Sequence, residues 1–130
     1  ALKGVGQEKN TNKTPLGNHI IRAMIGRNLP IYAVIKARRF TNQIWTKELD
    51  DPSITVDWIL SRVIWLSGKD LGRNRLGNVD TMQRYIYIHG TNEEHLLGTP
   101  SSHGCIRMSN EDVIELFDLV SVGDIVEIDF

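Results

Sequence analysis

The sequence predicts a mainly β domain, a β-rich α+β fold with one clear helix near its C-terminus. Several short segments alternate apolar and polar residues as half-buried strands do, whereas only the stretch around 109–120 repeats its apolar residues with a helical period. The 130 residues suffice for one domain with one sizeable core. No repeat, low-complexity tract or shift in composition marks a domain boundary.

The chain is expected to begin as a loop and then to enter two strands. The first eighteen or so residues are rich in Gly, Asn, Lys and Thr, which is typical of irregular structure. Thr-Pro-Leu-Gly at 14–17 predicts a turn, because proline presets φ and glycine can adopt positive φ. The segments HIIRAMI (19–25) and IYAVIKA (31–37) are rich in β-branched and apolar residues and predict strands.

Two later segments alternate clearly enough to assign their faces. In SRVIWL (61–66), Val63 and Trp65 are expected on the face opposite to Arg62, Ile64 and Leu66. In RYIYIH (84–89), Ile86 and Ile88 are expected opposite to Tyr85, Tyr87 and His89.

The helix is predicted to begin after Ser109, a residue type that caps helix N-termini, with acidic residues in its first turn. Its apolar stripe follows the spacing i, i+1, i+4, i+7 over Val113, Ile114, Phe117 and Val120. A Val-Gly-Asp turn then leads into a last strand at 126–130, and a weaker helical or mixed stretch is expected within 50–60.

Composition excludes several classes of protein. Fifteen basic and sixteen acidic side chains leave a net charge of −1, which gives no general attraction to nucleic acid or anionic membrane. No apolar run approaches the ~18 residues of a membrane span. One cysteine excludes an internal disulfide framework. The opening ALKGVGQEKN shows no apolar stretch of a signal peptide.

The single thiol, Cys105, lies in the octapeptide SSHGCIRM, residues 101–108. A free thiol has a pKa of about 8.5, so a nucleophilic cysteine needs a base or a positive field. His103 is close in sequence, but the backbone holds an i, i+2 pair apart. His89 is the better candidate for the base, because it ends a strand and the segment between it and Cys105 is long enough to return alongside that strand.

The neighbours of the thiol suggest supporting roles. Gly104 has no Cβ, so the N–H groups of Gly104 and Cys105 can point at a developing oxyanion. Ser102 can hydrogen-bond a ring nitrogen, and Arg107 can hold a substrate carboxylate or brace the start of the helix.

Plainer interpretations stay open at this point. A lone cysteine is more often a small buried hydrophobe, and His89 can be a structural strand-end histidine. His19 and His95 are assigned to surface or structural roles. His89, His95, His103 and Cys105 offer zinc ligands, but without a second cysteine or an H-x-x-x-H pair the spacing gives no strong zinc signal.

The segment IHGTNEEHLLGTPSSHGCIRMS, 88–109, strongly resembles the signature of the L,D-transpeptidase catalytic domain family (YkuD-like). His89-Gly90 matches its upstream His-Gly, and Ser102 to Cys105 matches its Ser/Thr-His-Gly-Cys, with Arg107 in the following position. KTPLGNHII (13–21) and the helix, turn and last strand also resemble the family. The resemblance implies a β-sandwich or mixed-sheet domain over residues 1–130. Family domains usually begin with one or two strands before the Thr-Pro segment, so the chain either lacks those strands or closes its sheet with another edge.

The resemblance also implies the chemistry, acyl transfer in peptidoglycan. Cys105 would attack a stem tetrapeptide and release D-alanine, with His89 as base, Gly104 and Cys105 as oxyanion donors, and His103 orienting the site. Arg107, Ser102 and Gly90 would serve substrate binding. An amine on a second stem would resolve the thioester into a 3→3 cross-link. No cofactor or metal is required, carbapenem-type inhibitors are expected to acylate the sulfur, and such a substrate implies an exported protein in the periplasm or cell wall, acting on cell-wall organisation and cell shape.

Three alternatives remain at this point. The same acyl-enzyme resolved by water would make an L,D-carboxypeptidase, and resolved by a lipoprotein lysine it would attach that lipoprotein. A vestigial Cys–His pair would leave a non-catalytic wall-binding module. The basic segment 36–39, KARR, and Arg73 with Arg75 either bind acidic stems or form a solvated surface.

Overall fold

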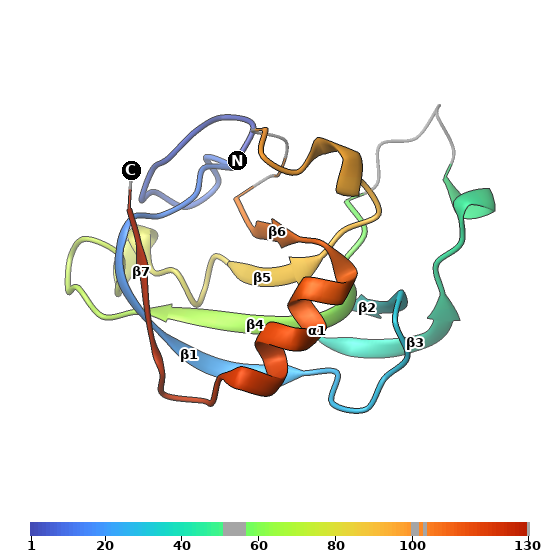
Figure 1. Cartoon of the computed structure of the whole chain (residues 1–130). Helices are drawn as coiled ribbons and strands as arrows, with labels where there is room; N and C mark the ends of the chain where they lie inside the picture. The colour runs from blue at the N-terminus through green and yellow to red at the C-terminus, as the bar shows by residue number, and fades with distance from the viewer. Residues whose placement is uncertain (51–56, 100–101, 103, 130) are drawn as a thin grey trace.

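The computed structural model describes residues 1–50, 57–99, 102 and 104–129, and within these ranges seven strands and one α-helix follow one another along the chain (Figure 1). The strands are β1 (Gly17–Ile25), β2 (Ala33–Lys36), β3 (Arg39–Ile44), β4 (Leu60–Gly68), β5 (Tyr87–Gly90), β6 (Ile106–Met108) and β7 (Ile125–Ile128). The α-helix is α1 (Asn110–Leu119), and three short 3₁₀ helices are η1 (Lys47–Leu49), η2 (Gly77–Val79) and η3 (Glu94–Leu96). This confirms the mainly β class with one helix near the C-terminus.

All seven strands belong to one mixed sheet with β4 at its centre. β4 pairs antiparallel with β1, β2 and β5, while β3 extends the sheet beyond β2 and β7 extends it beyond β1. β6 pairs with β5 in parallel. A parallel pair needs a long crossover, and the segment that joins β5 to β6 supplies it. The return of the chain alongside His89, expected from the length of this segment, is therefore confirmed.

The two faces of the sheet carry different clusters. Ile64 and Leu66 of β4 pack with Ile88 of β5 and with α1, which lies across this face (Figure 1). Val63 of β4 and Tyr87 of β5 pack in a second cluster on the other face, which also contacts Cys105. The alternation predicted for both strands is confirmed. The face that holds His89 and the thiol is the one that α1 leaves uncovered.

Two strands differ from the sequence prediction. The strand expected over 84–89 begins only at Tyr87, because Arg84 and Tyr85 belong to a turn in which their N–H groups bond back to residues 80–82 and Tyr85 has a φ of 54°. β3 was not predicted at all. Its side chains are mostly exposed and polar, so it has no alternating apolar pattern to detect.

The irregular N-terminal segment agrees with the expectation, whereas the helical or mixed stretch expected within 50–60 stays a prediction. Residues 1–16 are mostly irregular, with one isolated bridge between Val5 and Thr14. Of the stretch 50–60, positions 51–56 lie outside the described residues, and the rest contains no helix. Among the described helices, none combines the length and apolar character that crossing a bilayer requires.

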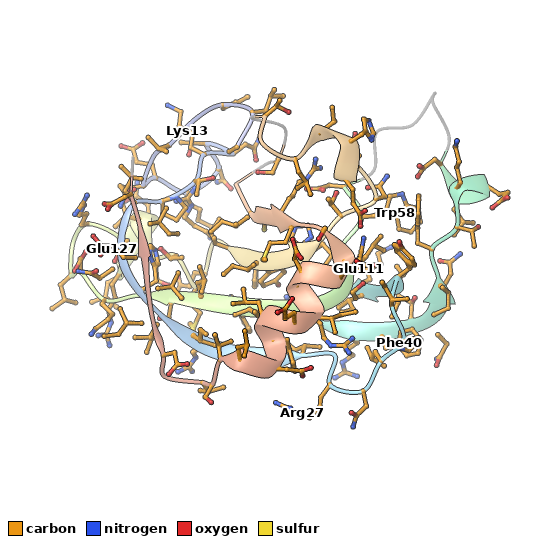
Figure 2. The ribbon with its side chains drawn as sticks, viewed as in Figure 1. Lys13, Arg27, Phe40, Trp58, Glu111 and Glu127 are labelled. Carbon is orange, nitrogen blue, oxygen red and sulfur yellow. The ribbon has the colours of Figure 1, made fainter. Side chains whose placement is uncertain are left out.

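The helix α1 begins where the sequence predicts it. The Ser109 hydroxyl accepts a hydrogen bond from the N–H of Asp112 at 3.1 Å, which satisfies one of the free amide groups of the first turn. Val113 and Phe117 are fully buried against the sheet. Arg27, labelled in Figure 2 on the loop after β1, places its guanidinium 5.0 Å from the Phe117 ring centre and closes the open side of that ring.

Replacing Ser109 by alanine is expected to lower the free energy of unfolding by about 1 kcal/mol, because the Asp112 N–H loses its acceptor. Urea denaturation measures this. Ser109→Asp keeps a capping oxygen and should stay within a few tenths of a kcal/mol of the parent. Equal losses in both variants would show that the cap contributes nothing.

Candidate active site

The sulfur of Cys105 is held between backbone groups of two tyrosines. Its Sγ accepts a hydrogen bond from the N–H of Tyr87 at 3.3 Å and donates one to the carbonyl oxygen of Tyr85 at 3.4 Å. The residue is half-buried and immediately precedes β6. The turn that shortens β5 therefore directs the Tyr85 carbonyl toward the thiol.

The loop before the thiol is closed by short polar contacts. The Ser102 hydroxyl donates to the Cys105 carbonyl at 2.6 Å and accepts a 3.4 Å contact from the N–H of Gly104. The Thr14 hydroxyl donates to the Gly104 carbonyl at 2.9 Å. Gly104 has a φ of 117°, and a Cβ there would lie 3.1 Å from the Lys13 carbonyl oxygen. Glycine is thus required by conformation and by the close approach of residues 13–14, which belong to the N-terminal loop where Lys13 is labelled in Figure 2.

His89 is fully buried near the end of β5. Its Nδ1 lies 2.7 Å from the carbonyl oxygen of Gly90, which can only accept, so Nδ1 carries the proton of the neutral ring. Nε2 then carries the lone pair, and no hydrogen-bond partner for it is found among the described residues. The ring is oriented as a base with its acceptor nitrogen unused.

The strand register places Cys105, which immediately precedes β6, next to the strand of His89. His89 is the partner of Arg107 in the parallel β5–β6 pair, so Cys105, two residues earlier, stands diagonal to it, beside Tyr87. Both side chains belong to the face that carries the second cluster, because His89 pairs with Val63 of that cluster and Cys105 packs against it. The thiol bonds to the Tyr85 carbonyl, not to the imidazole.

Burial favours the neutral forms of both groups. It raises the pKa of the Cys105 thiol to about 11, and the Asp57 carboxylate adds to this, while the Tyr87 N–H and the guanidinium groups of Arg107 and Arg84 oppose it. Burial likewise lowers the pKa of His89. At neutral pH the site therefore holds a thiol and an uncharged imidazole, and the thiol must lose its proton during the reaction.

The raised thiol pKa makes stability fall at high pH. Below pH 9 both the folded and the unfolded chain keep the thiol protonated, but from the ordinary value of 9.0 up to about 11 only the unfolded chain ionises it. We expect the free energy of unfolding to drop by about 2 kcal/mol across this window relative to Cys105→Ser. Denaturant titrations of both proteins at pH 8 and 10.5 measure the difference. Identical pH slopes would contradict the assigned burial.

Arg107 is buried between two carboxylates. Its guanidinium contacts Asp57 at 2.6 Å and Glu93 at 3.1 Å, and the side chain is 6% exposed. These ion pairs join β6 to the loop after β5 and to the approach to β4, and neither carboxylate lies at the start of α1, which Arg107 was expected to brace. Its predicted role in substrate binding stays a prediction. Asp57 and Glu93 were not singled out in the sequence, because neither lies in a motif and only the fold brings them to Arg107.

Gly90 is fixed by packing. A Cβ there would overlap the Asn110 amide oxygen and lie 2.7 Å from the Leu60 carbonyl oxygen. Asn110 is fully buried at the start of α1, where its amide accepts from Ser61 at 2.7 Å and donates to the Thr91 carbonyl at 2.8 Å. The predicted substrate contact of Gly90 is untested, whereas its need for a small residue is evident. The role of Asn110 gave no sequence signal beyond its place in the first helical turn.

The remaining candidates are placed as follows. His103 lies outside the described residues, so its orienting role stays a prediction. His19 is buried, with its ring nitrogens 3.1 Å from the Gly17 carbonyl and 3.0 Å from the Thr81 hydroxyl, which is a structural role. Within the described ranges no three His, Cys, Asp or Glu side chains are grouped as metal ligands.

A cavity of about 260 Å³ borders the site, lined in part by Thr14, Thr99, Ser102, Cys105 and Arg107.

Comparison with known proteins agrees with this geometry. The family model of the L,D-transpeptidase catalytic domain, YkuD, matches residues 4–128. YqjB of Bacillus subtilis (strain 168) is 51% identical over 40 residues, which cover 31% of this chain and 23% of that protein. YkuD of the same organism is 52% identical over 41 residues, 32% of this chain and 25% of that protein.

A third relative is the probable L,D-transpeptidase YbiS of Escherichia coli (strain K12), 50% identical over 40 residues, 31% of this chain and 13% of that protein. The matched segments thus span a quarter or less of the length of these relatives. The family model, in contrast, covers nearly the whole chain, and the chain belongs to the family of L,D-transpeptidase catalytic domains.

Proposed function

We propose that this chain is one catalytic domain that joins peptidoglycan stem peptides through an acyl-enzyme on Cys105. The observation that carries the proposal is the pairing of β5 with β6, which sets the single thiol beside the strand of a histidine whose Nε2 is oriented as an acceptor. Membership of the family supports peptidoglycan as the proposed substrate class. The residue roles below are proposals within that frame.

In the first half-reaction the thiol turns from the Tyr85 carbonyl toward Nε2 of His89, to which it gives its proton. Such contacts often tighten only when substrate binds. Sγ then attacks the carbonyl carbon that precedes the terminal D-alanine of a stem tetrapeptide, and a C–S bond forms. Collapse of the tetrahedral intermediate breaks the C–N bond, and the imidazolium of His89 protonates the departing amine as D-alanine leaves.

In the second half-reaction an amine of a neighbouring stem attacks the thioester. His89 takes a proton from that amine and a C–N bond forms. The C–S bond then breaks, and the leaving sulfur regains its proton from the imidazolium of His89. The product is a 3→3 cross-link and the enzyme is regenerated. The Cys105 thiol, the His89 imidazole and the two substrate amines exchange all the protons, so the scheme uses no cofactor or metal.

The oxyanion of each tetrahedral intermediate is proposed to lie against the N–H groups of Gly104 and Cys105. The Gly104 N–H is engaged by a 3.4 Å contact with the Ser102 hydroxyl, a long contact that a charged oxygen can replace. The hydrogen bonds from Ser102 and Thr14 hold the carbonyls of this loop and so fix the direction of its N–H groups.

Incubation with a disaccharide-tetrapeptide, followed by mass spectrometry, tests the proposal. The expected dimer has the mass of two donors less one D-alanine, because one D-alanine leaves for each cross-link formed. Cys105→Ala should form neither thioester nor dimer. Equal product profiles from the two proteins would overturn the assignment of the nucleophile.

The same experiment separates the other fates of the acyl-enzyme. A tripeptide product without dimer would indicate hydrolysis, that is, an L,D-carboxypeptidase, and transfer only to an added lysine peptide would indicate lipoprotein attachment. Absence of any adduct, including one with a carbapenem, would indicate a non-catalytic wall-binding module. Slow alkylation of the resting thiol would not indicate such a module, because the raised pKa of Cys105 already predicts slow alkylation. A peptidoglycan substrate would place the protein in the periplasm or cell wall.

A further inference from the structure

The hairpin that joins β2 to β3 carries an arginine against the aromatic side chains beside the thiol. Lys36 pairs with Arg39, so Ala37 and Arg38 form a two-residue loop. Both have positive φ, 49° and 63°, as the tight hairpin turn of this type requires. Asn and Gly are the residues that such a turn favours, and a backbone held in this region without them is a sign of a functional constraint.

The conformation lays the Arg38 guanidinium on an aromatic shelf formed by Trp65, Tyr85 and Tyr87. Its carbon lies 4.9 Å from the ring centre of Tyr85 and 5.3 Å from that of Trp65, and Nη1 donates to the Tyr87 hydroxyl at 3.2 Å. The rings of Tyr85 and Tyr87 each lie 5.9 Å from that of Trp65. The guanidinium is therefore held against these side chains by two cation–π contacts and one hydrogen bond.

This shelf adjoins the reacting sulfur. Tyr85 and Tyr87 are the residues whose backbone carbonyl and N–H hold Sγ of Cys105, so Arg38 and the sulfur contact the same two residues. Tyr85 is 52% exposed, which leaves the shelf open to a ligand.

Arg38 differs from Arg107 and Arg84, the two guanidinium groups whose charges act on the thiol. Arg107 is neutralised by Asp57 and Glu93, and Arg84 donates to the carbonyl oxygens of residues 6, 7 and 13. For Arg38, no Asp or Glu among the described residues lies within ion-pair distance. Its positive charge is thus available to an anion, and a planar fork suits a carboxylate.

We propose that Arg38, held on the shelf of Trp65, Tyr85 and Tyr87, binds a carboxylate of the donor stem peptide and so selects the donor. The inference rests on the proposed function for the identity of the peptide. It assigns to the hairpin the carboxylate recognition that the sequence suggested for Arg107. Either the terminal carboxylate of D-alanine or the side-chain carboxylate of the preceding diamino acid can supply the group.

The test measures binding, so that it does not depend on turnover. Isothermal titration calorimetry compares two proteins, Cys105→Ala and the double variant Cys105→Ala/Arg38→Gln. Each is titrated with three forms of the stem tetrapeptide: one with both carboxylates free, one with only the terminal carboxylate amidated, and one with only the side-chain carboxylate amidated. Arg38→Gln is expected to weaken binding of the free peptide about tenfold or more. Amidation of the recognised carboxylate should weaken binding to the Cys105→Ala protein as much as Arg38→Gln does. The same amidation should not weaken binding to the protein that also carries Arg38→Gln, and this result identifies which carboxylate Arg38 binds.

Arg39→Gln is the matched control, because it removes the same charge from the adjacent exposed position of the hairpin and should leave the dissociation constant within about twofold. Near-ultraviolet circular dichroism checks that the aromatic shelf is intact in each variant. The inference is overturned if Arg38→Gln binds the free peptide as the parent does, if Arg39→Gln weakens it equally, or if the parent binds none of the peptides. Arg38-dependent binding without a thioester in the parent enzyme would instead overturn the proposed function alone.

Discussion

His89→Gln is expected to lower the rate constant for acyl-enzyme formation by about 10²–10⁴-fold. Glutamine keeps a side chain of comparable size in a fully buried position but cannot take a proton from the thiol. With the thiol pKa near 11, the unassisted thiolate fraction at neutral pH is very small, so the loss of the base has a large effect. Stopped incubations with a stem tetrapeptide, read by intact-protein mass spectrometry, give the rate constant.

The pH dependence of acylation distinguishes a base from a structural histidine. Because burial lowers the pKa of His89, its neutral, active form prevails at and above pH 6.5, and the parent rate should be flat there and fall only at lower pH. The rate of His89→Gln should instead rise about tenfold per pH unit up to about 11, following the thiolate.

His19→Gln provides the matched control. That ring is equally buried but bonds to the Gly17 carbonyl and the Thr81 hydroxyl, away from the thiol, so its substitution should affect stability and leave the pH profile of acylation unchanged. A His89→Gln profile with the same shape as that of the parent would contradict the proposed base.

Arg107→Met is expected to lower the free energy of unfolding by about 2–3 kcal/mol. The variant leaves the carboxylates of Asp57 and Glu93 half-buried without the guanidinium that both contact. Removing one member of a fully buried ion pair costs about 3–5 kcal/mol, and the partial exposure of the two carboxylates reduces this. Guanidinium chloride or urea denaturation measures the change.

Arg73→Met is the control for that variant. Its guanidinium is 57% exposed and lies 4.0 Å from Asp70, so its loss should stay within about 0.5 kcal/mol. If Arg107→Met kept the parent stability but raised the KM for the donor, Arg107 would bind substrate and the bracing role would be wrong.

Local patterns in the sequence predicted most of the regular structure. The serine cap, acidic first turn and apolar stripe of α1 are each properties of a few neighbouring residues, and β4 and part of β5 alternate because one face packs on α1. β3 escaped detection, since an exposed polar edge strand has no such pattern. The turn at Tyr85 was missed because its alternation continues the pattern of β5 even though its backbone does not.

The candidate site divides in the same way. Cys105, His89 and the glycine before the thiol were identifiable from residue type and order, because thiol chemistry needs a base and an open backbone nearby. The partners of these residues were not. Asp57, Glu93 and Asn110 lie far along the chain from the groups that they contact, and their contacts exist only once β4, β5 and β6 have paired.

By itself the sequence determined the fold class, the family resemblance and the identity of the thiol and its candidate base, since these depend on short-range order and on residue chemistry. Tertiary structure alone decided that the thiol is held by two tyrosine backbones, that Arg107 contacts two carboxylates, and that Arg38 lies on the side chains of Trp65, Tyr85 and Tyr87. The physical reason is that burial, ion pairing and pKa depend on tertiary contacts between segments distant in sequence, and no local sequence pattern encodes those contacts.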